Sequence, residues 1–179
     1  AGAYVSIGVS ERDAVTGTLY NSNLILPARR QPGARTPQAE AHGLRARRLG
    51  RRRPRLSFPV VDTPWGPMGC MICWESYMPL ARVALYEKGV SLYISANTND
   101  NPEWQATAQH IALEGRCYFI NADLFFTRSM YPAGLNAQDE IARLPELVCR
   151  GGSCVIDPFG HYVTEPVWDR EAIISPTST

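Results

Sequence analysis

The chain has 179 residues, of which 45% are hydrophobic, so it is long enough to form a domain with a buried core. Its formal net charge of +1 gives no electrostatic reason to expect a nucleic-acid or membrane partner. We find no apolar run that could span a bilayer and no basic-then-apolar signal peptide. The 5 cysteines form no repeating framework, which favours a reducing, cytoplasmic location.

The first elements expected are two strands that form a hairpin, at residues 3–9 and 18–26. The polar stretch between them contains Glu11 and Asp13. Because short carboxylates commonly stabilise turns, we interpret both as turn residues rather than as catalytic bases.

An arginine-rich segment follows, at residues 28–58. It has almost no apolar periodicity, and Glu40 is its one acidic residue. Such a segment cannot bury enough apolar surface to fold on its own. Its basic run at residues 44–55 is typical of a nucleic-acid arm or a localisation patch. We favour a different explanation, a shifted reading frame, for which the reason is given at the end of this section.

The central feature is an expected turn from a strand into a helix. Residues 68–73 form a short apolar strand, and Pro79 favours the first turn of a helix that ends near Lys88 and Gly89. Cys73 therefore lies at the elbow between the two elements. The positive end of the helix dipole favours a thiolate there, and the Trp74 N–H could stabilise an oxyanion beside the sulfur.

Other interpretations of this cysteine remain open. Free cysteines are often buried as small hydrophobic residues. Cys70 and Cys73 also form a C-x-x-C pair, but Cys70 lies inside the expected strand rather than at a helix start, as a redox pair requires. A zinc site would need further ligands, and the remaining cysteines form no second close pair.

The next elements complete an α/β pattern. We expect a buried strand at residues 90–95, a polar loop at 96–101, a helix that starts at Asn101-Pro102-Glu103, and a strand at 117–122. Asn97 and Thr98 follow the strand adjacent to that of Cys73. Because the carboxyl ends of neighbouring parallel strands share one edge, they are candidates for a substrate pocket.

The last third of the chain is expected to contain a short surface helix at residues 140–147 and a hairpin at 150–157 and 162–167. Residues 123–129 are expected to leave the preceding strand. Gly151 and Gly152 favour a close backbone approach.

Three motifs resemble the nitrilase branch of the carbon–nitrogen hydrolase superfamily. They are I-C-W-E-S-Y-M-P-L-A-R-V-A-L-Y at 72–86, W-Q-A-T-A-Q-H-I-A-L-E-G-R-C at 104–117 and R-G-G-S-C-V-I-D-P-F-G at 150–160. The resemblance covers residues 3–27 and 60–174. It implies an α/β fold, namely a four-layer α/β/β/α sandwich whose N-terminal part is missing here. Residues 1–174 would then be a partial carbon–nitrogen hydrolase domain, with Ala172–Ile174 as its last strand.

The resemblance also implies the chemistry. Such enzymes are hydrolases of carbon–nitrogen bonds other than peptide bonds, and they use a cysteine, a lysine and two glutamates without a cofactor or metal. Cys73 corresponds to the nucleophile, which attacks a nitrile and proceeds through a thioimidate and a thioester to a carboxylic acid and ammonia. The implied partners are a small nitrile or amide and further copies of the chain in a homo-oligomer. Alternatives are an amidase of the same superfamily and a non-catalytic truncated remnant.

Four residues are candidates for the substrate pocket beside Cys73, namely Trp74, Glu75, Asn97 and Thr98. Glu75 has a structural alternative, because its carboxylate could instead bind the backbone at the elbow.

The partners of the nucleophile are not found in their expected places. By resemblance, the first glutamate should precede Ala1, and the lysine should lie in the arginine-rich segment, yet Lys88 is the only lysine. Back-translation of Pro37–Gly50 with permitted codons, read one base along, gives R-K-L-K-P-T-A-S-E-R-V-V-W, which resembles the missing lysine and glutamate segment. A two-base shift of Ile174–Thr179 similarly gives L-A-D-L-D. We therefore expect shifted reading frames in residues 28–58 and in the aberrant tail at 175–179, and an impaired site.

Overall fold

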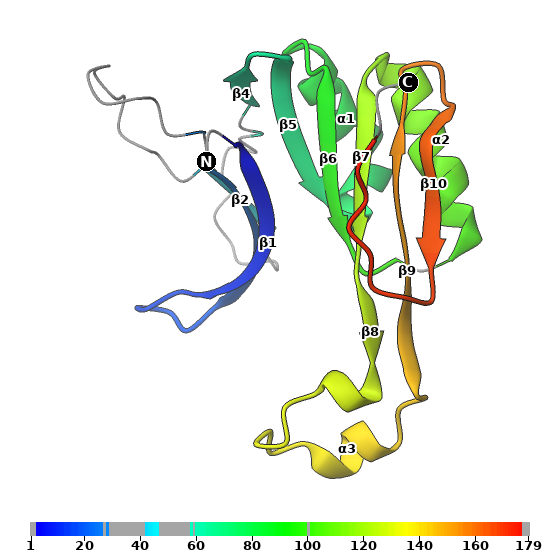
Figure 1. Cartoon of the computed structure of the whole chain (residues 1–179). Helices are drawn as coiled ribbons and strands as arrows, with labels where there is room; N and C mark the ends of the chain where they lie inside the picture. The colour runs from blue at the N-terminus through cyan, green and yellow to red at the C-terminus, as the bar shows by residue number, and fades with distance from the viewer. Residues whose placement is uncertain are drawn as a thin grey trace. The chain divides into compact units, whose positions relative to one another are not determined.

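The computed structural model describes residues 3–26, 28, 58, 60–99 and 101–176, together with the backbone of 42–46. The chain divides into two compact units, Ala1–Ala96 and Asn97–Thr179. Figure 1 labels most of the helices and strands of both units.

The first unit opens with the predicted hairpin. Strands β1 (Val5–Arg12) and β2 (Leu19–Leu26) pair antiparallel. Asp13 occupies the turn as predicted, and its carboxylate accepts the N–H groups of residues 15 and 16 at 2.9 and 2.8 Å. The prediction for Glu11 is wrong, because β1 continues through it and its carboxylate accepts a hydrogen bond from the Ser22 hydroxyl across the pair.

Strand β3 (His42–Ala46) pairs antiparallel with the other edge of β2. A short strand thus exists within the arginine-rich segment, where we expected no independent structure. It is compatible with that expectation because its partner is β2, outside the segment. Most of the segment lies outside the described residues, and so does the end of the tail, so the predictions made for them stay predictions.

The remaining strands of the first unit carry the elbow. Strand β5 (Gly66–Ile72) lies between β4 (Val60–Thr63), which is antiparallel to it, and β6 (Leu92–Asn97), which is parallel. β6 begins two residues later than the sequence predicted. The reason is that Val90 still belongs to the exit from the preceding helix, where its N–H donates to the Leu85 carbonyl at 3.4 Å.

A short 3₁₀ helix, η1 (Cys73–Tyr77), connects β5 to helix α1 (Pro79–Tyr86). Pro79 stands in the first turn of α1, as predicted. Leu85 of this helix packs directly over Gly69 of β5, where any Cβ would lie 2.9 Å from the leucine side chain. This close packing fixes the helix against the strand that precedes the elbow.

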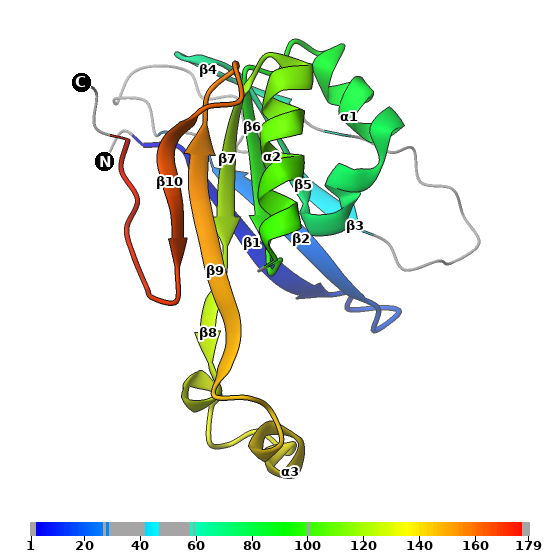
Figure 2. The same ribbon diagram turned by 90° about the vertical axis from the view of Figure 1, so that its right-hand side faces the viewer.

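The second unit is built on helix α2 (Pro102–Gly115) and strand β7 (Tyr118–Asp123). The Asn101 side chain caps α2, since it accepts the Trp104 N–H at 2.8 Å. Trp104 is fully buried and meets Phe119 of β7 edge to face, with ring centroids 6.3 Å apart. Figure 2 shows α2 running along the strands of this unit.

Strands β9 (Leu147–Ile156) and β10 (Tyr162–Trp168) form the predicted hairpin, and β9 also pairs with β7. Gly152 has a φ of +111°, and a Cβ there would lie 2.7 Å from the Trp168 ring. Only glycine therefore fits at this crossing, as the sequence indicated.

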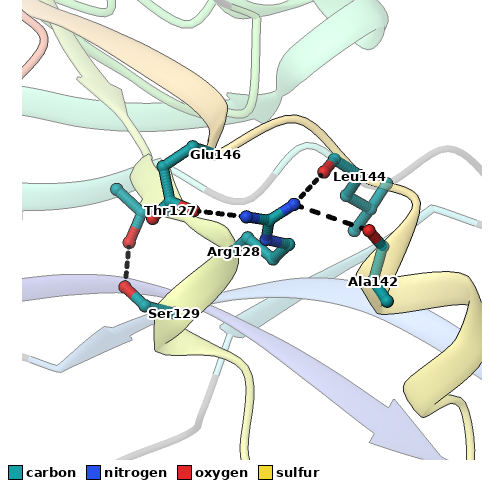
Figure 3. Close-up of polar contacts among 6 residues, drawn as sticks. All are labelled: Thr127, Arg128, Ser129, Ala142, Leu144 and Glu146. Atoms are coloured by element: carbon teal, nitrogen blue, oxygen red, sulfur yellow. Dashed lines mark hydrogen bonds and ion pairs between the residues drawn. The ribbon is translucent and has the colours of Figure 1, made fainter.

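An arm extends from β9, as both Figure 1 and Figure 2 show. It contains β8 (Phe125–Thr127), which pairs with β9, then η2 (Arg128–Met130) and helix α3 (Gln138–Ala142). Arg128 ties its base together, because the guanidinium donates to the Leu144 carbonyl and to the Glu146 carboxylate, each at 2.9 Å (Figure 3).

The chain leaves β7 after Asp123, as predicted, but residues 125–127 then form a separate strand that the sequence did not indicate, since β9 is long enough to pair with them. The helix prediction for this region is wrong. The surface helix spans Gln138–Ala142 instead of residues 140–147. Pro145 explains the earlier end, because a proline disfavours helical backbone at the residue before it.

The final strand expected at Ala172–Ile174 is not formed. Residues 171–176 have no regular structure, and Ile173 is 100% exposed. Within the part of the chain that the structure describes, these residues pair with no strand, which is the reason that the sequence pattern failed here. In the same described part, no helix is long and apolar enough to cross a membrane.

Candidate active site

Cys73 lies at the junction between β5 and η1, where the sequence predicted an elbow. Its φ is +48°, which is the left-handed region that residues other than glycine rarely adopt. This conformation costs about 1–2 kcal/mol for a residue with a Cβ. Surrounding contacts must therefore hold the elbow in place.

The first of these contacts comes from Glu75. Its carboxylate accepts the Ile72 N–H at 2.9 Å. Desolvation raises the pKa of the Glu75 carboxyl, and the hydrogen bond from Ile72 opposes part of that increase. The structural alternative noted from the sequence, a carboxylate bound to the elbow backbone, is the arrangement that the structure contains.

Ser76 supplies the next contacts, and it is fully buried. Its carbonyl accepts a hydrogen bond from Arg82 of α1 at 2.8 Å, and its hydroxyl accepts one from Tyr93 of β6 at 3.1 Å. Sequence reasoning missed Arg82 and Tyr93. The available signal was an arginine on the helix that follows the nucleophile and a tyrosine in a buried strand, and neither reveals its partner.

The thiols differ in their surroundings. All of the cysteines are free, and Cys73 is half-buried whereas the others are buried. Burial raises the pKa of the Cys70 thiol to about 12. Such a thiol stays protonated at neutral pH, which argues against a redox role for the Cys70–Cys73 pair. Within the described residues, no group of three or more His, Cys, Asp or Glu side chains could hold a metal ion.

Trp74 lies beside Cys73 at the surface, with 70% of it exposed. Its ring meets Tyr77 edge to face at a centroid distance of 5.4 Å. The predicted role of Trp74 as a pocket wall stays a prediction.

The other two pocket candidates belong to the second unit. Asn97 is buried, and its side-chain amide donates to the Asn121 side chain at 2.6 Å, whereas Thr98 is exposed. The register between β5 and β6 places Ile72 opposite Ala96. The pocket role of both residues remains a prediction.

Asn121 is the centre of a buried polar network that the sequence did not reveal. Its side-chain oxygen also accepts the Trp104 indole N–H at 3.0 Å, and its amide donates to Asp123 at 2.7 Å. Asp123 in turn accepts the Asn99 N–H at 3.0 Å. This network fixes the loop that follows β6. An asparagine inside an otherwise apolar strand was the signal that could have indicated it.

Lys88 has a structural contact. Its ammonium donates a hydrogen bond to the Phe58 carbonyl. Phe58 lies outside α1, so this carbonyl is not one of those at the end of the helix that Lys88 follows.

A cavity of about 470 Å³ lies within the second unit. Asp123, Ser153, Val167 and Arg170 are among the residues that line it, together with residues 171–174. None of the predicted site residues lines it, so it is not the pocket expected beside Cys73.

Curated relatives of the chain are nitrilases. An aliphatic nitrilase of Sinorhizobium fredii is 39% identical over 98% of this chain and 55% of its own length. A bifunctional nitrilase/nitrile hydratase of Nicotiana tabacum is 40% identical over 66% of this chain and 35% of its own. A nitrilase of Bradyrhizobium diazoefficiens is 35% identical over 97% and 53%. The chain thus spans about half the length, or less, of these relatives.

Solved structures show the same fold at lower identity. A Saccharomyces cerevisiae member of branch 10 of the nitrilase superfamily matches with a TM-score of 0.65 and 19% identity, over 92% of this chain and 55% of that one. A carbon–nitrogen hydrolase from Helicobacter pylori matches with a TM-score of 0.67 and 18% identity, over 96% and 60%. The predicted nitrilase-like α/β fold is therefore confirmed.

The family model for carbon–nitrogen hydrolases matches residues 1–178, which is almost the entire chain. Together with the nitrilase relatives, this match confirms the resemblance seen in the three sequence motifs. The chain belongs to the carbon–nitrogen hydrolase family.

Proposed function

We propose that this chain carries the nucleophile of a nitrilase-type hydrolase, and that Cys73 is that nucleophile. The observation that supports this most strongly is the left-handed conformation of Cys73 at a strand-to-helix turn, since strained residues of this kind concentrate at functional sites. The nitrilase relatives support the substrate class, an organic nitrile.

The proposed reaction begins at the sulfur. The Cys73 thiolate forms a bond to the nitrile carbon, one π-electron pair of the C≡N bond moves to nitrogen, and nitrogen takes up a proton to give a thioimidate. Addition of water and loss of ammonia give a thioester. A second water releases the carboxylic acid and regenerates the thiol.

We further propose that this chain, as written, does not complete the cycle. The family's lysine stabilises developing negative charge and its glutamates transfer protons. Lys88 is the only lysine of the chain and donates to the Phe58 carbonyl. An arginine is a poor substitute, because its head is planar and permanently charged.

Two broader expectations accompany this proposal. The domain is expected to comprise residues 1–174, and self-association is expected by resemblance to the family. A cytoplasmic location is expected from the cysteines, which form no repeating framework. Sedimentation of the purified chain measures the self-association directly.

The test combines ammonia release with alkylation of Cys73. The full chain and Cys73→Ala are incubated with aliphatic, aromatic and arylacetonitrile substrates, and we expect equal, background release of ammonia. We also expect an electron-poor heteroaromatic nitrile to slow iodoacetamide alkylation of Cys73 saturably. Repeated turnover that Cys73→Ala abolishes would refute the proposed impairment. If the rate of Cys73 alkylation does not change with nitrile concentration, the proposal that Cys73 is the nucleophile is refuted.

A further inference from the structure

Glu75 contacts the backbone immediately before Cys73, and its carboxylate accepts the Ile72 N–H at 2.9 Å. We propose that Glu75 is a positioning residue, which holds Cys73 in its left-handed conformation through this hydrogen bond. The inference rests on the proposed function of Cys73 for its chemical consequence. Its structural content can be tested without any nitrile.

The strand pairing explains why Ile72 needs such a partner. β4 pairs with β5 only from Gly66 to Gly69, so the described pairing on that side of β5 stops before Ile72. A backbone N–H that is buried without a partner destabilises the folded state. Glu75 supplies the acceptor that a longer neighbouring strand would otherwise provide.

The same hydrogen bond constrains Cys73. It closes a ring that runs from the Ile72 N–H through Cys73 and Trp74 to the Glu75 carboxylate, so rotation about the Cys73 φ angle would break it. The far end of this ring cannot follow such a rotation. The next residue, Ser76, is buried and is held by Arg82 from α1 and by Tyr93 from β6.

A purely space-filling role for Glu75 does not account for its chemistry. Desolvation raises the pKa of this carboxyl, which means that its charged form is disfavoured where it stands. An apolar side chain would fill the same volume without that cost, but it would leave the Ile72 N–H without an acceptor. Glutamine would keep an acceptor oxygen in nearly the same position. Glu75→Met therefore separates the two explanations, because methionine fills the volume but offers the Ile72 N–H no acceptor, whereas Glu75→Gln keeps both.

The direct test is amide hydrogen exchange and the Cys73 φ angle, both measured by NMR on the full chain. In wild type and Glu75→Gln we expect the Ile72 amide to be protected equally, within twofold, and φ to be positive. In Glu75→Ala we expect exchange at Ile72 to be about tenfold faster, because one hydrogen bond contributes about 0.5–1.5 kcal/mol, and φ to leave the left-handed region. Glu87→Ala, an exposed acid at the end of α1, is the matched control and should change neither value.

Clear outcomes would overturn the proposal. One is Glu75→Ala with wild-type exchange at Ile72 and a positive φ at Cys73. Another is Glu75→Gln with lost protection, because its amide oxygen still offers an acceptor. If Glu75→Ala does not fold, Glu75→Met, which keeps the volume but offers no acceptor, is measured in its place. Faster exchange at Ile72 and loss of the positive φ at Cys73 would support the proposal, and wild-type values of both would reject it.

The chemical consequence is measured separately, by nitrile protection of Cys73 against iodoacetamide. We expect Glu75→Gln to retain saturable protection and Glu75→Ala to lose it, while Glu87→Ala behaves as wild type. If wild type shows no protection, the proposed function fails. The exchange and φ measurements then still decide the role of Glu75.

Discussion

Cys73 and Arg116 have almost the same backbone conformation, with φ values of +48° and +50°, yet they reach it in different ways. Arg116 follows helix α2, and its N–H donates to the Ala112 carbonyl, an ordinary way to end a helix. Cys73 follows a strand, where no helix end requires a left-handed residue. Side chains hold its conformation instead, namely Glu75, Arg82 and Tyr93. A conformation supported in this way at a half-buried thiol supports the proposed role of Cys73, whereas the same conformation at Arg116 only ends a helix.

Among variants that test this difference between Cys73 and Arg116, we expect Arg82→Ala to have the largest effect on stability. The guanidinium is buried and donates to the Ser76 carbonyl at 2.8 Å, so its loss leaves that carbonyl without a charged donor and opens a gap. We expect the free energy of unfolding to fall by about 2–4 kcal/mol. Chemical denaturation measures this. Arg116→Ala, which alters the exposed helix end, is the control, and an equal loss for both variants would contradict the difference between the two sites.

Glycine should relieve backbone strain at both position 73 and position 116, because it has no Cβ. We expect Cys73→Gly to be more stable than Cys73→Ala, and Arg116→Gly to be more stable than Arg116→Ala, by about 1 kcal/mol each. This order is the reverse of that in ordinary backbone conformations. Thermal unfolding of the four variants checks it. A more stable alanine at position 73 would show that Cys73 is not held in the left-handed region.

Glu75 gives the elbow a dependence on pH. Because desolvation raises the Glu75 pKa above its ordinary value of 4.5, folding favours the protonated carboxyl. The cost of ionisation is therefore absent below about pH 4.5 and complete above the raised pKa. We expect Glu75→Gln to gain stability over wild type as pH rises through this range. Denaturant midpoints measured from pH 4 to 8 test it, and a constant difference would contradict it.

The smallest effect is expected beside Arg116. Its guanidinium lies over the Phe159 ring, 6.0 Å from the centroid, and Phe159 is 66% exposed. An exposed cation–π contact contributes about 0.5–1 kcal/mol, so Phe159→Leu should lower the free energy of unfolding by no more than that. A loss as large as that of Arg82→Ala would mean that side chains also hold the Arg116 turn.

The elbow itself could be predicted from the sequence, because Pro79 cannot continue a strand and fits the first turn of a helix. The sequence placed the strand end at Cys73, and the structure ends β5 at Ile72. The start of α2 was predicted equally well, since Asn101, Pro102 and Glu103 act through local contacts. Signals of this kind depend on a few neighbouring residues.

The supports of the elbow could not be predicted in the same way. Arg82 and Tyr93 meet Ser76 only after α1 and β6 have packed against β5. The Asn121 network likewise joins residues from separate elements. The prediction of the last strand was wrong for a different reason: residues 172–174 have a strand-like sequence pattern but pair with no described strand.

The most direct measurement is mass spectrometry of the full chain after reaction with an electron-poor heteroaromatic nitrile. We predict an added mass of one nitrile molecule, as expected for a thioimidate, located on Cys73 by peptide mapping and absent from Cys73→Ala. The buried thiols at positions 70, 117, 149 and 154 should remain unmodified. An adduct on any of these instead of Cys73, or an unmodified Cys73, would contradict the proposal that Cys73 is the nucleophile.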